Sequence, residues 1–204
     1  MALFVFVITF NSYSQNIKSF FKLSCPEKQW VLCHIFIAKK SYNIGLEASE
    51  KAKELSKDST LDGDLNGGQL DAFRHAYWMA RITQNFGWRS AATLGKAHEK
   101  GNYREYKKHR TEDGTFPDAQ SGQMDYLNND AGIELGKCNK DTSPQELTNK
   151  VKELLFTGKL FILKKDKVGN YLKCNGDKIT SEELKGKWET PKCILPSNNR
   201  KTTN

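Results

Sequence analysis

The stretch that decides the fold is Asp71-Ala-Phe-Arg-His-Ala-Tyr-Trp-Met-Ala-Arg-Ile-Thr-Gln-Asn85. Placed on a helix, it carries apolar side chains on nearly every face, which is typical of a helix at the centre of a bundle. Asp71 and His75, one turn apart, nevertheless share a stripe with Trp78 and Ile82. The helix therefore carries two titratable groups into the interior, where they need partners.

Two further segments are expected to form helices that face this central one, over residues 89–101 and 121–138. Each carries a stripe in which small residues lead to polar side chains. The stripes consist of Ala91, Gly95, His98 and Asn102 for the first, and of Asp125, Asn129, Gly132 and Gly136 for the second. Small residues allow helix backbones to approach closely. The polar side chains of all three helices are therefore expected to meet.

The rest of the chain predicts more helices and one small hairpin. A capping box at Ser24 and Glu27 begins a helix through residue 40, and others are expected over residues 42–57 and 144–156. A long charged loop is expected over residues 103–122, and a β-hairpin over residues 160–174, in which 160–163 pairs with 170–174. The predicted fold class is mainly α: a compact domain of five to six helices with a small C-terminal β-hairpin.

Composition indicates a globular chain with a terminal export signal. The 204 residues include 37% hydrophobic and 27% charged residues, enough for one domain with a core. Residues 1–15 form a short apolar run with a polar end, typical of a signal peptide, although a core strand is the alternative. The helical core is expected over 16–157, its C-terminal extension over 158–196 and a disordered tail over 197–204. A secreted or periplasmic protein without a transmembrane segment is predicted.

The charge bears on the class of binding partner, and the cysteines bear on disulfide bonds and metal binding. The net charge of +8 comes from scattered lysines without a nucleic-acid-binding module, so no specific nucleic-acid partner is predicted, whereas contact with an anionic surface remains open. Five cysteines match no zinc ribbon or redox pair. Cys174 and Cys193 are the expected disulfide, and Cys33 is expected to be a buried thiol.

The converging polar groups are candidates for a metal site. An aspartate and a histidine four residues apart suit a divalent ion such as zinc, and His98 and Asp125 complete a set of four ligands with Asp71 and His75. The adjacent Glu99 is then a candidate general base, with His75 and Asp125 as the other catalytic residues. The alternative is a buried hydrogen-bond network without catalysis. Residues that would contact substrate or complete that network are Arg74, Trp78, Asn102, Asn128 and Asn129.

A second metal candidate is the loop before the central helix. Asp62, Asp64 and Asn66 alternate before a glycine, as in the first half of a calcium loop. The twelfth position is Phe73 instead of the bidentate glutamate, so the loop is not an EF-hand. An Asp/Asn/Gly turn that caps a helix is the alternative.

Three motifs carry a family resemblance. They are Asp71-Ala-Phe-Arg-His-Ala-Tyr-Trp78, Ala97-His-Glu99 with Asn102, and Met124-Asp125-x-x-Asn128-Asn129-x-x-Gly132. Over about residues 22–137 the chain resembles a bacterial family of secreted or toxin-associated domains whose function is uncharacterised. This resemblance implies no activity.

A weaker similarity is to the prokaryotic secreted phospholipases A2, through Arg74-His75-Ala76-Tyr77-Trp78. Ala76 stands where that family has a calcium-binding aspartate. The similarity implies a histidine that activates water and an aspartate that orients it, roles that His75 and Asp125 match.

Three functions are therefore expected as alternatives. The first is a secreted hydrolase whose His/Asp centre, with zinc or calcium, cleaves a lipid ester or phosphodiester in a small-molecule or lipid substrate. The second is a non-catalytic secreted domain whose polar centre only fixes helix packing. The third is a calcium-braced, phospholipase A2-like dyad of His75 and Asp125.

Overall fold

The computed structural model describes residues 20–111 and 116–199. The expected signal peptide and residues 200–204 of the expected tail lie outside the described residues. The helices and strands are α2 (Cys25–Cys33), α3 (Ile35–Leu55), α4 (Gln69–Phe86), α5 (Trp88–Lys107), α6 (Ala119–Cys138), α7 (Pro144–Phe156), β1 (Phe161–Leu163), α8 (Ser181–Leu184) and β2 (Ile194–Pro196). The predicted mainly helical fold with a small antiparallel C-terminal sheet is confirmed.

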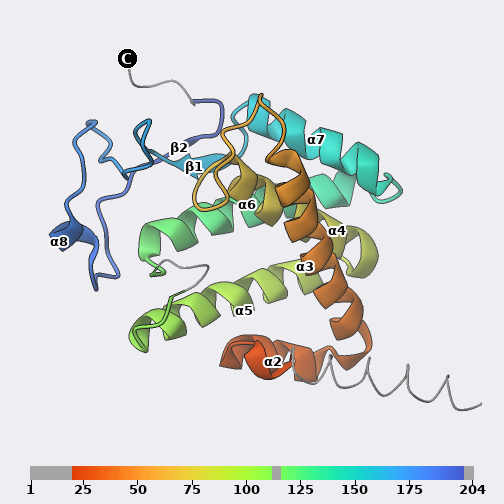
Figure 1. Cartoon of the computed structure of the whole chain (residues 1–204). Helices are drawn as coiled ribbons and strands as arrows, with labels where there is room; N and C mark the ends of the chain where they lie inside the picture. Colours follow the sequence, from red (N-terminus) through yellow and green to blue (C-terminus); the bar gives the residue numbers. More distant parts are fainter. Residues whose placement is uncertain (1–19, 112–115, 200–204) are drawn as a thin grey trace, which may run out of the picture.

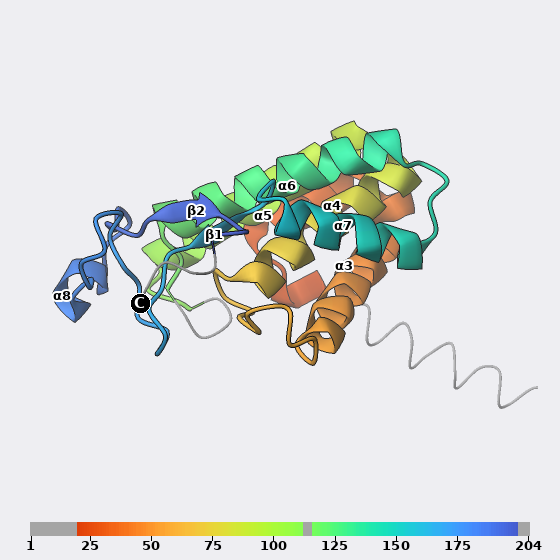
Figure 2. The same ribbon diagram turned by 90° about the horizontal axis from the view of Figure 1, so that it is seen from above.

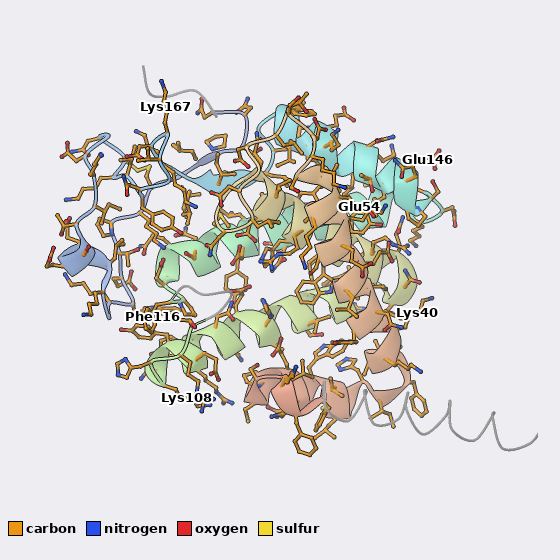
Figure 3. All side chains as sticks on the ribbon, viewed as in Figure 1. Lys40, Glu54, Lys108, Phe116, Glu146 and Lys167 are labelled. Carbon is orange, nitrogen blue, oxygen red and sulfur yellow. A yellow bond between two sulfur atoms is a disulfide. The ribbon has the colours of Figure 1, made fainter. Side chains whose placement is uncertain are left out.

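Helix α4 lies in the middle of the bundle, as its apolar sequence predicts. It contacts α3, α5, α6, α7 and β1, and Figures 1 and 2 show the four helices arranged around it. Phe73 and Tyr77 on one face of α4, and Ile82 on the opposite face, are all completely buried. Many charged side chains lie at the periphery instead, for example Lys40 and Glu146 in Figure 3.

Helices α4 and α6 approach each other closely because α6 places glycines between them. A Cβ atom on Gly132 would overlap the carbonyl oxygen of Ala76, and one on Gly136 would lie 2.6 Å from that of Ala80. No larger residue fits at either position without moving a helix backbone. The glycine stripe of α6 therefore fixes the side chains beside it against α4.

The first predicted helix is wrong in extent, since the chain bends at His34. There the backbone leaves the helical region with φ −130° and ψ 39°, and the ring Nδ1 lies 2.9 Å from the carbonyl oxygen of Trp30. The bend lets α2 pack on α5 while α3 packs on α4. It also leaves Cys33 exposed, which corrects the expectation of a buried thiol.

The expected long loop is shorter than predicted because α5 continues past Gly101 to Lys107. Gly101 is a packing position: a Cβ atom there would lie 2.8 Å from the Cβ of Ser24, the residue that caps α2. The glycine lets two helices touch and does not end one.

The C-terminal sheet uses a different partner strand from the one predicted. β1 pairs antiparallel with β2, with Ile162 opposite Leu195, whereas the segment near residue 171 makes an isolated bridge with Lys165. The expected disulfide between Cys174 and Cys193 is present and holds the chain just before β2. This cross-link lies beside the edge of β1, because Lys164 N donates to the carbonyl oxygen of Cys193 at 2.8 Å.

The start of the expected tail is ordered. Ser197 is completely buried, and its hydroxyl donates to the carbonyl oxygen of Leu155 at 2.8 Å. Gln69, the first residue of α4, donates to the carbonyl oxygen of Ser197. Along the described residues, no helix combines the length and the apolar character needed to cross a membrane.

Candidate functional site

The structure brings together Asp71, His75 and Asp125 beneath the surface. The Nε2 atom of His75 lies 3.6 Å from Asp71 Oδ1 and 3.4 Å from Asp125 Oδ1. The side chain of His75 is only 3% exposed. One ligand atom from each residue lies within 4.8 Å of the other two. Two carboxylates from different helices therefore face the same ring nitrogen.

Asn129 fixes which ring nitrogen faces the carboxylates. One turn after Asp125 on α6, its Oδ1 lies 3.3 Å from His75 Nδ1. Because this oxygen only accepts, Nδ1 carries the proton and donates to it. The Nε2 lone pair then faces two negative oxygens, an arrangement that requires a positive charge between them. A proton on Nε2, a neighbouring cation or a bound metal ion meets this requirement.

Arg74 is the cation that the protein itself supplies. Its Nη2 donates to Asp71 Oδ1 at 2.7 Å and lies 3.4 Å from His75 Nε2. Against the two carboxylates Asp71 and Asp125, one guanidinium leaves a formal charge of −1 when His75 is neutral. The cluster can therefore accept further positive charge.

The distances around His75 Nε2 fit a small metal ion better than hydrogen bonds. Hydrogen bonds from a ring nitrogen to a carboxylate are about 2.7–3.2 Å long. In a tetrahedral site with metal–ligand distances of about 2.0–2.1 Å, ligand atoms lie about 3.4 Å apart. The separations of 3.4 and 3.6 Å match the second geometry. An ion at this place would have to share Asp71 Oδ1 with Arg74, whose Nη2 lies 2.7 Å from that oxygen.

The backbone before α4 holds the second oxygen of Asp71. Gly67 N donates to Asp71 Oδ2 at 2.7 Å. Gly67 has φ +82°, and a Cβ atom there would lie 2.8 Å from Leu163, so glycine suits both the conformation and the space. This contact orients the candidate ligand Asp71, just as the contact of Asn129 orients the candidate ligand His75. No sequence signal assigned this role to Gly67.

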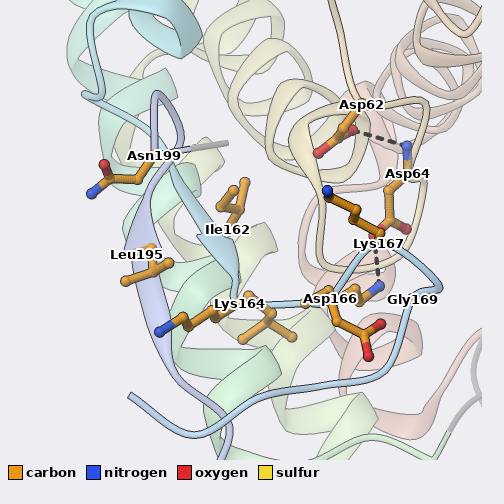
Figure 4. A pocket seen from close by; sticks show the side chains of 11 residues that line it. Asp62, Asp64, Ile162, Lys164, Asp166, Lys167, Gly169, Leu195 and Asn199 are labelled. Carbon is orange, nitrogen blue, oxygen red and sulfur yellow. Dashed lines mark hydrogen bonds and ion pairs between the residues drawn. The ribbon is translucent and has the colours of Figure 1, made fainter. Parts of the chain in front are cut away.

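The predicted calcium loop is held by a lysine. Asp62 and Asp64 accept backbone N–H groups at residues 64, 66 and 69, as in consecutive Asx turns. Lys165 Nζ donates to Asp64 Oδ2 at 2.6 Å and to the carbonyl oxygen of Asn66. A calcium ion would have to displace this ammonium group. Figure 4 shows Asp62 and Asp64 on one side of the adjoining hollow, with Leu195 and Asn199 on the other.

His98, the fourth predicted ligand, has another partner. Its Nδ1 lies 3.0 Å from Oε1 of Glu27 on α2, while its ring centroid lies 6.1 Å from that of His75. Burial raises the pKa of Glu27, but the hydrogen bond and charge of His98 and the contacts of Ser24 outweigh it, so the pKa is lowered overall. The capping box in the sequence predicts the contact of Glu27 with Ser24, but not that with His98.

The Glu27–His98 pair makes stability depend on pH. A carboxylate whose pKa is lowered by folding stabilises the fold above its unfolded pKa, near 4.5, and loses this effect as the pH falls through the folded value. Glu27→Gln is expected to cost about 1–3 kcal/mol at neutral pH. In urea denaturation, its difference from the wild type should shrink below pH 4.5. A difference that stays constant down to about pH 3 would contradict this assignment.

The matched control for that experiment is Glu146→Gln. Glu146 closes the same capping box with Ser143 at the start of α7, and its pKa is lowered by Ser143. It is exposed, and among the described residues its pKa is lowered by Ser143 and then by the charge of Lys150, not by a histidine. We expect a smaller loss of stability for Glu146→Gln than for Glu27→Gln at neutral pH.

Glu99, the predicted general base, lies on α5 close to Asn102 of the same helix and to Gly122 of α6. It is buried, accepts from Asn102 Nδ2 at 3.2 Å, and lies where a Cβ atom on Gly122 would be 3.5 Å from its Oε2. Burial, and then the charge of Glu99, raise the pKa of Tyr126 on α6. Asn102 and Gly122 line a hollow together with Asp71 and Asp125. Glu99 thus lies behind a wall of the site.

Asn128 belongs to the fold. Its side-chain amide donates to the carbonyl oxygen of Phe161 and accepts from the N–H of that residue, at 3.0 and 2.8 Å. These two bonds join α6 to β1 much as a neighbouring strand would. From the sequence alone, Asn128 is grouped with Asn129. In the structure Asn128 contacts the backbone of β1, whereas Asn129 contacts His75.

Two hollows meet at Arg74. The first has a volume of about 50 Å³ and is lined by Asp71, Arg74 and Asp125. The second, about 150 Å³, is lined by Arg74, His75, Trp78 and His98. The structure therefore places Arg74 and Trp78 at the walls around the buried cluster. A substrate group that reached either hollow would lie beside the candidate ligands.

The fold and the site define a class: a helical domain with a buried Asp/His/Asp cluster on its central helix. A family model described as "Domain of unknown function (DUF6973)" matches residues 28–159, which is more than half of the chain. The chain belongs to this family. The match contains the whole cluster and ends just before β1. Neither the curated proteins nor the solved structures contain a match to the chain.

Proposed function

We propose that this chain is a metal-assisted hydrolase that cleaves an ester bond in a lipid or phosphodiester substrate. Asp71, His75 and Asp125 are its proposed ligands for a divalent ion such as zinc. The observation that carries the proposal is the pair of carboxylate oxygens 3.6 and 3.4 Å from a buried, oriented imidazole nitrogen. A metal ion there would supply a Lewis acid that polarises the scissile ester.

The surrounding residues take roles that follow from their contacts. Arg74 lies at both hollows and is 28% exposed, so it can bind a negatively charged oxygen of the substrate. Asn129 holds the ring of His75 in place. Glu99 holds Asn102 at the wall of the smaller hollow. Burial of the cluster strengthens each of these electrostatic interactions.

One observation favours a second candidate function. The 2.7 Å contact of Arg74 with Asp71 supplies positive charge to the cluster without a metal ion. On this alternative, the centre only fixes the packing of α4 and α6 in a non-catalytic domain. It predicts a protein that binds no divalent ion and loses stability when Asp125 is changed.

Export is part of the proposal. The disulfide between Cys174 and Cys193 supports it, because such bonds persist mainly in oxidising compartments. The apolar run at residues 1–15 is the proposed signal, and a secreted or periplasmic location follows.

Hydrolysis of a chromogenic acyl ester and of a chromogenic phosphodiester tests the proposed activity. We expect the zinc-loaded wild type to cleave one of them, and Asp125→Asn to lower the rate at least about 100-fold by weakening the ion's ligand set. The control is Asp130→Asn, an exposed change of the same kind on α6, with an unchanged rate. A wild type that cleaves neither ester, or a folded Asp125→Asn variant of full activity, would refute the proposal.

A further inference from the structure

A chain of hollows runs from the buried cluster to the surface between α2 and α3. The inner hollow shares Gly45, Ser49, Trp78 and His98 with a second one of about 230 Å³. This second hollow shares Leu23, Val31, Ala38 and Tyr42 with a third of equal volume. Because adjoining hollows share their walls, we describe them together as the α3 channel.

The sequence of α3 explains why the channel is hollow and apolar. Ile35, Ala38, Tyr42, Gly45 and Ser49 follow one another at helical spacing along one face of α3. The small residues on this face, Ala38, Gly45 and Ser49, leave space that longer side chains would fill. From Ile35 to Ser49 the helix rises about 21 Å, which is long enough for an extended fatty-acyl chain.

The two ends of the channel differ in polarity. The inner end carries Arg74, His75 and His98, together with the indole of Trp78. Trp78 Nε1 has no hydrogen-bond partner within the described parts of the chain, and a Cβ atom on Gly45 would lie 3.4 Å from it. This N–H is therefore a donor directed at the wall of the channel. A ligand with one polar end and a long apolar body matches this distribution.

Apolar side chains exposed to solvent lie at and beside the outer end of the channel. Ile35 lines the outermost hollow, and Leu32 and Phe36 are its neighbours where the chain passes from α2 to α3; Phe36 is 96% exposed. Lys39 lines the outermost hollow, and Lys40 follows it. An exposed apolar rim with adjacent lysines is typical of a surface that takes up lipids from an anionic interface.

We infer that the α3 channel binds one fatty-acyl chain, with its carboxyl or ester group at the inner end beside Trp78 and His75. This inference rests on the proposed function for the cleavage of the ester, but binding of the chain is measured separately. It selects the lipid ester over the phosphodiester as the substrate class. The apolar walls supply affinity, and Arg74 and Trp78 orient the polar end.

The test is a fluorescence titration of the full chain with palmitate and with octanoate, by displacement of a fluorescent fatty acid. Ala38→Phe fills the middle of the channel and leaves the inner end open. It is expected to weaken palmitate binding at least about tenfold, because each buried methylene strengthens binding about fourfold. Octanoate, which ends before Ala38, should bind as it does to the wild type.

The control is Asn43→Phe, which adds the same ring to an exposed position of α3 outside the channel and should change neither affinity. If Ala38→Phe does not fold, Val31→Phe fills the channel from α2. A wild type that does not bind palmitate, or equal binding by Ala38→Phe, overturns the inference. Palmitate binding requires no cleavage of an ester, so a failure of the hydrolase proposal leaves this readout intact.

Discussion

Replacing Gly132 with alanine is expected to lower the free energy of unfolding by about 3–5 kcal/mol. The new methyl group would overlap the carbonyl oxygen of Ala76 and contact its backbone, which belongs to the rigid centre of α4. Because a backbone cannot move aside as a flexible side chain can, the two helices must separate. Urea denaturation followed by circular dichroism measures the loss.

Gly122→Ala is the matched control on the same helix. Its methyl group would meet Glu99 Oε2 at 3.5 Å, an ordinary contact, and alanine is favoured over glycine within a helix by up to about 1 kcal/mol. We expect this variant to be as stable as the wild type or more so. Equal losses in both variants would show that the α4–α6 approach is not fixed by Gly132.

Asp118→Ala is expected to have the second largest effect, also about 3–5 kcal/mol. Asp118 caps α6 by accepting the N–H groups of Gln120 and Ser121, and it forms an ion pair with Lys192 in which both side chains are buried. Alanine removes the cap and leaves an ammonium group without its carboxylate. The midpoint of thermal unfolding should fall accordingly.

A second pair of variants separates the cap from the ion pair. Asp118→Asn keeps an oxygen for the N–H groups of α6 but removes the charge. The double variant Asp118→Asn/Lys192→Met should be more stable than Asp118→Asn alone, because no unpaired buried charge then remains. Strictly additive losses in this double-mutant cycle would contradict a direct interaction between Asp118 and Lys192.

Both predictions concern α6 because this helix brings Asp125 and Asn129 to His75. The approach to α4 sets the distance of Asp125 from His75, and the cap sets where the helix begins. Changes at Gly132 or Asp118 should therefore disturb the candidate site through its scaffold. Asp125→Asn should disturb it with little change in the fold.

The helices and the central cluster could be predicted because their signals are local. The all-round apolar pattern of α4 and the glycine stripe of α6 lie within single helices, and they suffice to bring Asp71, His75 and Asp125 together. The bend at His34 depends instead on where α2 and α3 find partners. The pairing of Ile162 with Leu195 joins segments far apart in the chain, and periodicity does not encode such pairs.

The contacts of long charged side chains could not be predicted for a related reason. Lys165 reaches the loop at Asp64 across the fold, and Glu27 reaches His98 from another helix. Because each of these side chains is long and flexible, several partners are within its reach, and only the tertiary structure determines which one it contacts. The predicted ligand set therefore included His98, which the structure places with Glu27, and a calcium loop whose oxygens contact Lys165.

Zinc titration of the metal-stripped full chain by isothermal calorimetry tests the central claim most directly. The proposal predicts one zinc ion per chain for the wild type and for His34→Ala, whose histidine contacts Trp30 at the end of α2 and is not a proposed ligand. His75→Ala, shown to be folded by circular dichroism, should lose this binding. A wild type that binds no zinc, or a His75→Ala variant that binds it equally well, would contradict a metal centre at Asp71, His75 and Asp125.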